Sequence, residues 1–158
     1  MRFLINLLIG WPERIAQYLL ALAPLLARIV VGWVFMLSGW GKFHDLPHLI
    51  DLFTNDWGIP LPRFFAPFTA GVELFGGVFL LLGLLTRISA GALAVTMVVA
   101  IISAKWSDVD SLETLLGFDE TEYFALFTWL AIAGAGKLSV DHLLLRWIGS
   151  SGQPAAPG

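Results

Sequence analysis

The sequence of 158 residues contains no cysteine. A chain without thiols forms no disulfide, holds no metal through thiolate ligands and carries no thiol relay of its own. Charge is also scarce, because 13% of the residues are charged, whereas soluble domains average about 25%. Nine basic residues against twelve acidic ones give a net charge of −3. Nucleic acid is therefore not expected as a partner, because no basic face is available to neutralise phosphates.

What the sequence has in abundance is apolar side chains. Hydrophobic residues make up 58% of the chain and the mean hydropathy is +0.81, whereas soluble domains are about 45–50% apolar. Too little polar surface remains to cover a globule in water, so the composition predicts a membrane protein with the lipid bilayer as its first partner. We expect one membrane domain over residues 1–149 and a disordered Gly/Pro/Ser/Ala-rich tail over residues 150–158.

Four segments are predominantly apolar over a length close to the roughly 20 residues that a membrane-spanning helix needs. They cover about residues 19–40, 64–85, 88–104 and 123–138. The sequence therefore predicts an all-α fold, an integral membrane four-helix bundle with short interfacial helices. Pro24 falls inside the first segment, where a proline kinks a helix or marks a break.

Three short stretches outside these segments are predicted to be helical, two of them at the interface. Residues 3–11 suit a helix lying on the bilayer, and residues 112–118 suit a second one within an acidic loop. Ser139 suits the N-cap of a third helix, which has Asp141 near its start and runs through residues 143–148. The N-terminal stretch is not expected to be a cleaved signal peptide, because Glu13 and Arg14 interrupt its apolar core.

Positive charges near the ends of the spans predict the orientation of the chain. With the N-terminus inside, the cytoplasmic ends carry five basic residues: Arg2, Arg14, Arg87, Lys137 and Arg146. The opposite loops carry three: Lys42, Arg63 and Lys105. Cytoplasmic loops are richer in Lys and Arg, so both termini are expected in the cytoplasm, in a multi-pass protein of the cell's inner (plasma) membrane.

Two ionisable residues fall inside predicted spans, Arg28 and Glu73. An ionised side chain deep in a bilayer costs several kcal/mol unless it faces the protein interior and has a partner. From the predicted ends of their spans, Arg28 lies roughly 13 Å deep and Glu73 roughly 18 Å deep at 1.5 Å per residue. An arginine side chain can bridge this offset, so we expect the two to form a buried ion pair. The pair has two alternative roles, a structural register lock or a ligand- or proton-binding site.

Helical spacing places each of these charges on a face of small residues. On the first span the stripe comprises Arg28, Gly32, Phe35, Gly39 and Lys42. On the second span the corresponding face comprises Ala66, Thr69, Glu73, Gly76 and Gly77, opposite a phenylalanine-rich side that suits lipid. Small residues let helices approach closely, and glycine beside a buried charge leaves space for a guest. The small residues expected to line such a cavity are Gly32, Gly39, Thr69, Gly76 and Gly77.

A second constellation, His44 and His48, has the i, i+4 spacing of metal ligands on a helix. Pro47 between them disturbs helical geometry, so the two histidines are weak candidates and no metal is expected.

Three motifs together resemble the DoxX family of small four-helix membrane proteins. The first is Leu25-Leu26-Ala27-Arg28 with Gly32, Phe35, Gly39 and Gly41-Lys42-Phe43. The second is Val72-Glu73-Leu74-Phe75-Gly76-Gly77, running on to Leu82-Gly83-Leu84-Leu85-Thr86-Arg87. The third, Gly134-Ala135-Gly136-Lys137-Leu138-Ser139-Val140-Asp141, is similar to a closing Gly-x-Gly-[Arg/Lys]-x-Ser-x-Asp signature. The resemblance covers about residues 19–145 and marks six positions: Arg28, Lys42, Glu73, Arg87, Lys137 and Asp141.

The resemblance implies a redox context, because relatives in the family look like membrane subunits of thiosulfate:quinone oxidoreductases and others are associated with thiol or oxidative stress. With no cysteine and no pair of histidines inside a span, electrons have no carrier on this chain. We therefore expect an accessory or quinone-interacting subunit that binds no cofactor covalently and takes electrons from a soluble or membrane partner protein. The alternatives are a carrier or channel for a small solute, a metal or a lipid-like molecule, which would require a homo-oligomer, and a non-enzymatic anchor that recruits soluble partners.

Overall fold

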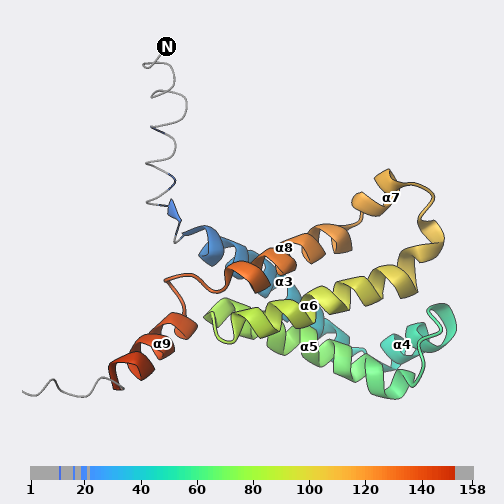
Figure 1. Cartoon of the computed structure of the whole chain (residues 1–158). Coiled ribbons are helices and arrows are strands. Elements are labelled where there is room, and N and C mark those ends of the chain that lie inside the picture. The colour runs from blue at the N-terminus through green and yellow to red at the C-terminus, as the bar shows by residue number, and fades with distance from the viewer. Residues whose placement is uncertain (1–10, 12–15, 17–18, 21, 152–158) are drawn as a thin grey trace, which may run out of the picture.

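The computed structural model describes residues 11, 16, 19–20 and 22–151, and within these ranges the regular structure is helical throughout. Four longer helices are α3 (Leu22–His44), α5 (Pro62–Leu82), α6 (Thr86–Ala100) and α8 (Asp119–Ala133). The shorter α-helices are α4 (Leu46–Asp51), α7 (Leu112–Leu116) and α9 (Val140–Ser151). Two π-helices, η2 (Leu52–Asp56) and η3 (Ile101–Lys105), and a 3₁₀ turn, η4 (Trp106–Asp108), complete the order shown in Figure 1. The predicted all-α class is confirmed.

Three helices are long and apolar enough to cross a membrane: Leu22–His44, Pro62–Leu82 and the continuous segment Thr86–Asp108. The chain is thus a membrane protein with several candidate spans. The fourth predicted span corresponds to α8, which has 15 residues. That length gives about 22 Å, which is shorter than the roughly 30 Å hydrocarbon core. Membrane crossing by α8 therefore stays a prediction.

Several helix ends follow from local sequence. Leu20 lies in a turn and α3 is described from Leu22, but residue 21 lies outside the described residues, so the kink or break expected at Pro24 stays a prediction. Gly83, at φ 67°, ends α5 in the left-handed conformation that glycine adopts without steric cost. The predicted loop helix is confirmed as α7, with Ser111 accepting a hydrogen bond from the Thr114 N–H as its N-cap.

The N-terminal interfacial helix predicted over residues 3–11 lies outside the described residues except for Trp11. Most of the predicted tail, residues 152–158, also lies outside them. At the start of this tail α9 continues to Ser151, two residues past the predicted end of the membrane domain at residue 149.

The main core lies where α3, α5, α6 and α8 meet. It contains Val31 and Phe35 of α3, Leu80 of α5, Ala90, Leu93, Ala94 and Met97 of α6, and Phe127 and Leu130 of α8. Phe35 packs edge-on against Phe127 with ring centroids 4.8 Å apart. Because each of the four helices contributes to one cluster, burial of these side chains fixes their mutual arrangement.

Helices α3 and α5 pack with their backbones in close contact. A Cβ atom on Gly39 would overlap the backbone of Leu74, and one on Gly77 would overlap the backbone of Met36. Gly39 and Gly77, which belong to the small-residue faces predicted for these two helices, thus lie at the contact between them. Phe64, Phe68 and Phe75 are exposed on the side predicted to suit lipid.

A second, smaller core closes one end of the α3–α5 pair. Leu49 of α4 and Phe53 of η2 are buried against Ala66 and Ala70 of α5. Figure 1 shows α4 at the end of α5 that is far from α9. We name this the α4 end, and the opposite end, where α3 begins and α5 turns into α6, the α9 end.

Candidate functional site

At the α9 end, Arg28 is held by backbone carbonyls. Its side chain is 1% exposed, its Nη2 donates to the Leu138 carbonyl at 2.5 Å and its Nε donates to the Pro24 carbonyl at 3.3 Å. The Nη1 group packs against Gly83, where a Cβ atom would overlap it. Among the described residues this Nη1 has no hydrogen-bond partner.

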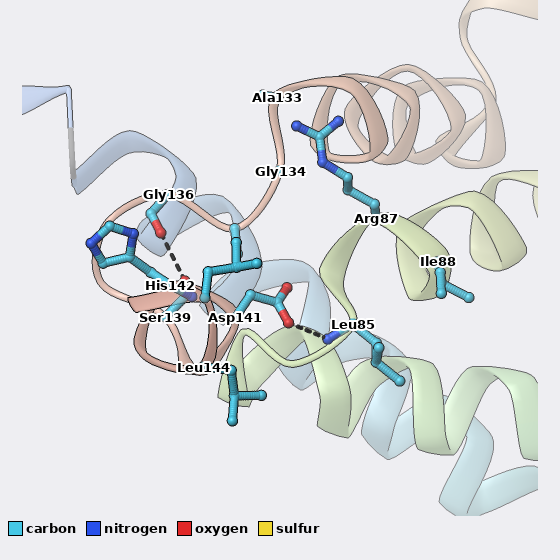
Figure 2. Close-up of a pocket in the computed structure, with 12 residues that line it drawn as sticks. Leu85, Arg87, Ile88, Ala133, Gly134, Gly136, Ser139, Asp141, His142 and Leu144 are labelled. Carbon is cyan, nitrogen blue, oxygen red and sulfur yellow. Dashed lines mark hydrogen bonds between the residues drawn. The ribbon is translucent and has the colours of Figure 1, made fainter. Parts of the chain in front are cut away.

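Asp141, on the first turn of α9, caps α6. Its two carboxylate oxygens accept hydrogen bonds from the N–H groups of Leu85 at 2.7 Å and Thr86 at 2.9 Å, and Figure 2 shows the first of these contacts. The Asp141 N–H donates in return to the Gly83 carbonyl at 2.9 Å. A carboxylate at a helix N-terminus satisfies free N–H donors and opposes the positive end of the helix dipole. Asp141 therefore fastens α9 to the turn between α5 and α6.

Arg87 and Gly134 make a matching contact at the end of α8. The Arg87 Nη1 group donates to the carbonyls of Ala131 at 3.1 Å and Ile132 at 2.7 Å, in the last turn of that helix. Gly134 adopts φ 83°, and a Cβ atom there would lie 3.2 Å from Arg87 Nε. Figure 2 shows the guanidinium turned toward this turn of the chain.

The closing motif completes this arrangement, and its predicted cap is confirmed. Ser139 Oγ donates to the Gly136 carbonyl at 2.7 Å and accepts from the His142 N–H at 3.1 Å, at the start of α9. We call Arg28, Gly83, Arg87, Ser139 and Asp141 the joint. A cavity of about 500 Å³ lies beside it. The Asp141 carboxylate and the Ser139 hydroxyl, which line this cavity, are already hydrogen-bonded to the chain's own backbone. Lys137 is exposed and stands outside these contacts.

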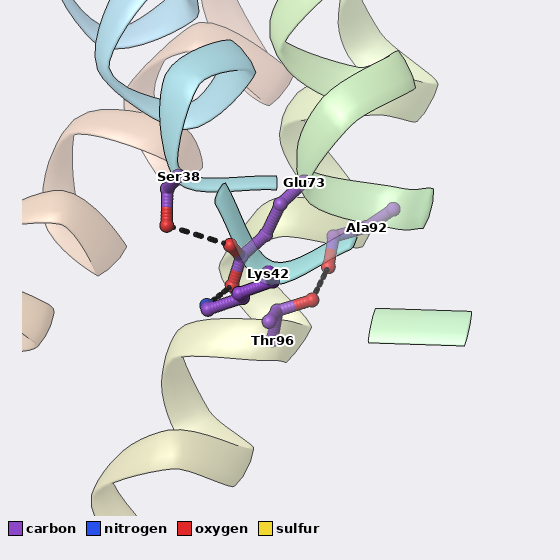
Figure 3. A network of polar contacts seen from close by, with 5 residues as sticks. All are labelled: Ser38, Lys42, Glu73, Ala92 and Thr96. Atoms are coloured by element: carbon purple, nitrogen blue, oxygen red, sulfur yellow. Dashed lines mark hydrogen bonds and ion pairs between the residues drawn. The ribbon is translucent and has the colours of Figure 1, made fainter. Parts of the chain in front are cut away.

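Glu73 lies at a different level and has different partners. Its side chain is 3% exposed, and its Oε1 atom forms an ion pair with Nζ of Lys42. Its Oε2 atom accepts a hydrogen bond from Ser38 Oγ at 2.9 Å. Figure 3 shows Lys42 and Ser38 on α3 converging on this carboxylate from α5, with Thr96 of α6 nearby.

The predicted ion pair between Arg28 and Glu73 is therefore wrong, although both side chains are buried as expected. The reason is the register of the two helices. Gly39 packs against Ala70 and Leu74, which brings Glu73 level with Lys42. Arg28 precedes Ser38 by ten residues, or about 15 Å along a helix. The prediction compared the depths of Arg28 and Glu73, counted from predicted span ends. That comparison could not show that Lys42, on the same stripe of α3, lies nearer to Glu73.

A cavity of about 430 Å³ adjoins this ion pair. It extends from Glu73 and Lys42 toward the α4 end, between α5 and the C-terminal half of α6. Its walls are mostly apolar, with four further polar or amphipathic side chains: Thr69, Thr96, Ser103 and Trp57. An apolar cavity of roughly 300–1,000 Å³ with a few convergent polar groups is typical of small-molecule sites. We take it as the candidate site.

The glycines predicted to line a cavity do not do so. The space beside Gly32, Gly39 and Gly77 is taken up by the facing helix, mainly its backbone. The space beside Gly76 is filled by the Leu93 side chain. Space next to a missing side chain is taken by close helix packing, because an empty void there would forfeit contacts. Thr69, one position of this predicted set, does line the cavity.

Sequence reasoning missed most of the cavity wall. Phe53, Trp57 and Ile59 come from the connection between α3 and α5, and Ser103 comes from η3. The usable signal was the apolar character of that connection, together with Thr96 on the third span. No local pattern indicates a π-helix, so the direction in which Ser103 points was not predictable.

The two weak metal candidates are both exposed. His44 Nδ1 lies 2.9 Å from the Trp40 carbonyl, and His48 is on α4. No group of three potential ligands among His, Asp and Glu gathers in the part of the chain that the structure describes.

Comparison with known proteins supports the motifs. The sequence profile of one family, DoxX, matches residues 23–106. A Bacillus subtilis (strain 168) protein named "Putative oxidoreductase CatD" is 33% identical over 127 residues, which cover 79% of this chain and 89% of that protein. The inner membrane protein YqjF of Escherichia coli (strain K12) is 28% identical over 120 residues, which cover 76% of this chain and 90% of that protein. No solved structure matches the chain.

Proposed function

This chain belongs to the DoxX family of membrane proteins, and from that premise we propose that it binds a quinone in the cavity beside Lys42 and Glu73. In this proposal the chain is an accessory, quinone-interacting subunit of a redox system in the inner (plasma) membrane, with both termini in the cytoplasm. The name of the Bacillus subtilis relative, which describes that protein as an oxidoreductase, supports the redox context.

The observation that carries the proposal is the position of the ion pair at one end of an apolar cavity. The Lys42 ammonium has three donors, of which one is directed at Glu73. The remaining donors are available to a carbonyl oxygen of a quinone ring. The Glu73 carboxylate has further lone pairs that can accept a hydrogen bond from a hydroquinone hydroxyl. Head group and apolar body would thus meet the polar end and the apolar walls respectively.

Reduction of a quinone to a hydroquinone takes two electrons and two protons. The chain has no cysteine, so in this proposal the electrons come from the reduced cofactor of a partner protein. Ser38 and Lys42, which contact the carboxylate, are the groups through which protons would reach the ring oxygens.

One alternative function draws on the same cavity. A carrier for a lipid-like molecule would also need an apolar cavity with a polar end, and would act without a redox partner. The two functions differ in their ligand preference: a carrier for lipid-like acids would favour a carboxylate head group at Lys42, whereas the quinone site favours an uncharged ring.

Binding to the full-length protein in lipid nanodiscs tests the proposal. We would titrate decyl-ubiquinone and 2,3-dimethoxy-5-methyl-benzoquinone, its tailless counterpart, and follow quenching of tryptophan fluorescence, because Trp57 lines the cavity. Wild-type protein should bind both probes. The double variant Lys42→Met/Glu73→Gln, which leaves no unpaired charge, should bind about tenfold more weakly, equivalent to the loss of about one hydrogen bond to a charged group.

Lys137→Met is the matched control, because Lys137 is an exposed lysine outside the cavity. Affinity unchanged in the double variant would remove the ion pair from the binding site. Binding of decanoate in preference to either quinone would favour the carrier function.

A further inference from the structure

We infer that the ligand of this cavity is a membrane-borne molecule with an apolar tail, and that it enters sideways from the bilayer through an opening between α5 and α6. This inference rests on the proposed function for the chemistry of the head group. It adds the route and the class of tail, which the head-group contacts do not specify.

Side chains that line the cavity also lie on the lipid-facing surface of two spanning helices. Phe68 of α5 is 56% exposed, and Val95 and Val99 of α6 are 64% and 47% exposed, yet all three line the cavity. A residue can have both properties only at a rim, where the cavity meets the outside. Both helices are apolar enough to span a membrane, so at this depth the outside is hydrocarbon. We name these three residues the rim.

The course of the two helices explains the opening. Near the α9 end α5 and α6 are joined by a tight turn, and Leu93 fills the space over Gly76. Figure 1 shows the helices separating from this turn toward the α4 end. The cavity occupies the space between the parts of these two helices that lie toward the α4 end. A wedge between two spans that is open on one side faces lipid.

The end of the cavity toward the membrane surface is covered. Leu49 of α4 and Phe53 of η2 are buried there, 5% and 4% exposed, and both line the cavity. Trp57 and Ile59 pack against the same cluster. The route from water would thus have to displace a packed apolar cluster, whereas the rim is formed by side chains that already contact the bilayer.

Two π-helices contribute to this same cavity. Phe53 belongs to η2, and Ser103 belongs to η3, which continues α6. A π-turn inserts an extra residue, turns the following side chains away from their helical positions and occurs frequently at functional sites. Here two separate elements carry this uncommon geometry, and both give a wall residue to one cavity. The two π-helices therefore point to a ligand independently of the rim.

The test distinguishes binding of the head group from binding of the tail by comparing the two quinones. Equilibrium affinity depends on the bound state, so a bulky rim matters only to a ligand whose tail lies in the opening. In nanodiscs, Val95→Phe/Val99→Phe should weaken decyl-ubiquinone about tenfold, since a pocket is sensitive to a change of even one methylene. The tailless quinone should change by less than about twofold. Val98→Phe is the matched control, because Val98 is an exposed valine of the same helix outside the cavity wall.

Equal weakening of both quinones by the rim variant, or no weakening of decyl-ubiquinone, would overturn the lateral opening. If neither quinone binds the wild type, the proposed function fails, and the opening is then tested without a quinone. Phosphatidylcholine brominated on its acyl chains should quench the Trp57 component of fluorescence, measured as the difference between wild type and Trp57→Phe. This quenching should fall in the rim variant, and its absence in wild type would refute the opening.

Discussion

Lys42 of α3 and Glu73 of α5 form an ion pair inside the membrane-spanning part of the chain, and the carboxylate is the more deeply buried partner. Ser38 engages the second carboxylate oxygen at 2.9 Å. The polar contacts that the structure gives Glu73 thus come from α3. A buried charge of this kind is tolerated only while its partners stay in place.

Removing one partner of this ion pair should destabilise the protein more than removing both. Lys42→Met leaves an uncompensated carboxylate and should lower the free energy of unfolding by about 3 kcal/mol. Lys42→Met/Glu73→Gln should recover most of that loss, because an amide needs no counter-charge. The measurement is unfolding in mixed detergent micelles, followed by circular dichroism. Equal losses in the single and double variants would show that the two side chains are not coupled.

Two glycines of α3, two positions apart, should respond in opposite ways to alanine. Gly39→Ala places a methyl group into the backbone of α5 and should destabilise the fold by about 1–3 kcal/mol, because backbone atoms cannot rotate aside. Gly41→Ala meets nothing within 4 Å and should be neutral or stabilising by up to about 1 kcal/mol through helix propensity. Thermal unfolding of the two variants side by side checks this. Similar unfolding temperatures would argue against the close contact of α3 and α5.

Gly83, the glycine of the joint, has no room for a side chain. Gly83→Ala combines left-handed strain, about 1–2 kcal/mol, with overlap of the Arg28 guanidinium. We expect less folded protein in the membrane and a lower unfolding temperature. Gly91→Ala, in open space on α6, is the matched control. The expression and melting of Gly83→Ala should improve when Arg28 is shortened to Ala in the same chain; a further loss would show that overlap is not the cause.

Asp141 should behave as a helix cap rather than as a catalytic acid. Asp141→Ala removes both hydrogen bonds to the start of α6 and should cost about 1–2 kcal/mol, and Asp141→Asn should cost less because one oxygen acceptor remains. Asp45→Ala is the control, since Asp45 stands at the N-cap of α4 without a side-chain cap bond. Quinone affinity per folded molecule should stay unchanged in all three variants. A specific loss of affinity in Asp141→Asn would place this residue in the binding site.

The sequence predicted the helical class and the packing faces well, because period and side-chain size act locally. Burial of Arg28, Gly32, Phe35 and Gly39 on one face of α3 is an example. It could not predict which buried charges meet, since that depends on the register between helices. Gly39 against Leu74 sets this register, and no feature of either segment alone encodes it.

The candidate site was less predictable than the fold. Glu73, Lys42 and Thr69 were identified from the sequence, but their cavity is closed by Phe53 and Trp57. These belong to a connection whose helical and π-helical course depends on burial against α5. The motif ending in Ser139 and Asp141 was found readily, yet its contacts are explained by helix capping.

The joint has a consequence for how the chain is made. Arg28 lies in the first described span. One of its two backbone acceptors, the Pro24 carbonyl, is on the same helix, but the other, the Leu138 carbonyl, follows 110 residues later. During synthesis this arginine leaves the ribosome long before that second acceptor exists. It must therefore be accommodated by the insertion machinery, by lipid head groups or by water until the last helices arrive. Early stop codons and short C-terminal truncations should consequently be recognised by membrane quality control through an unsatisfied arginine near the N-terminus.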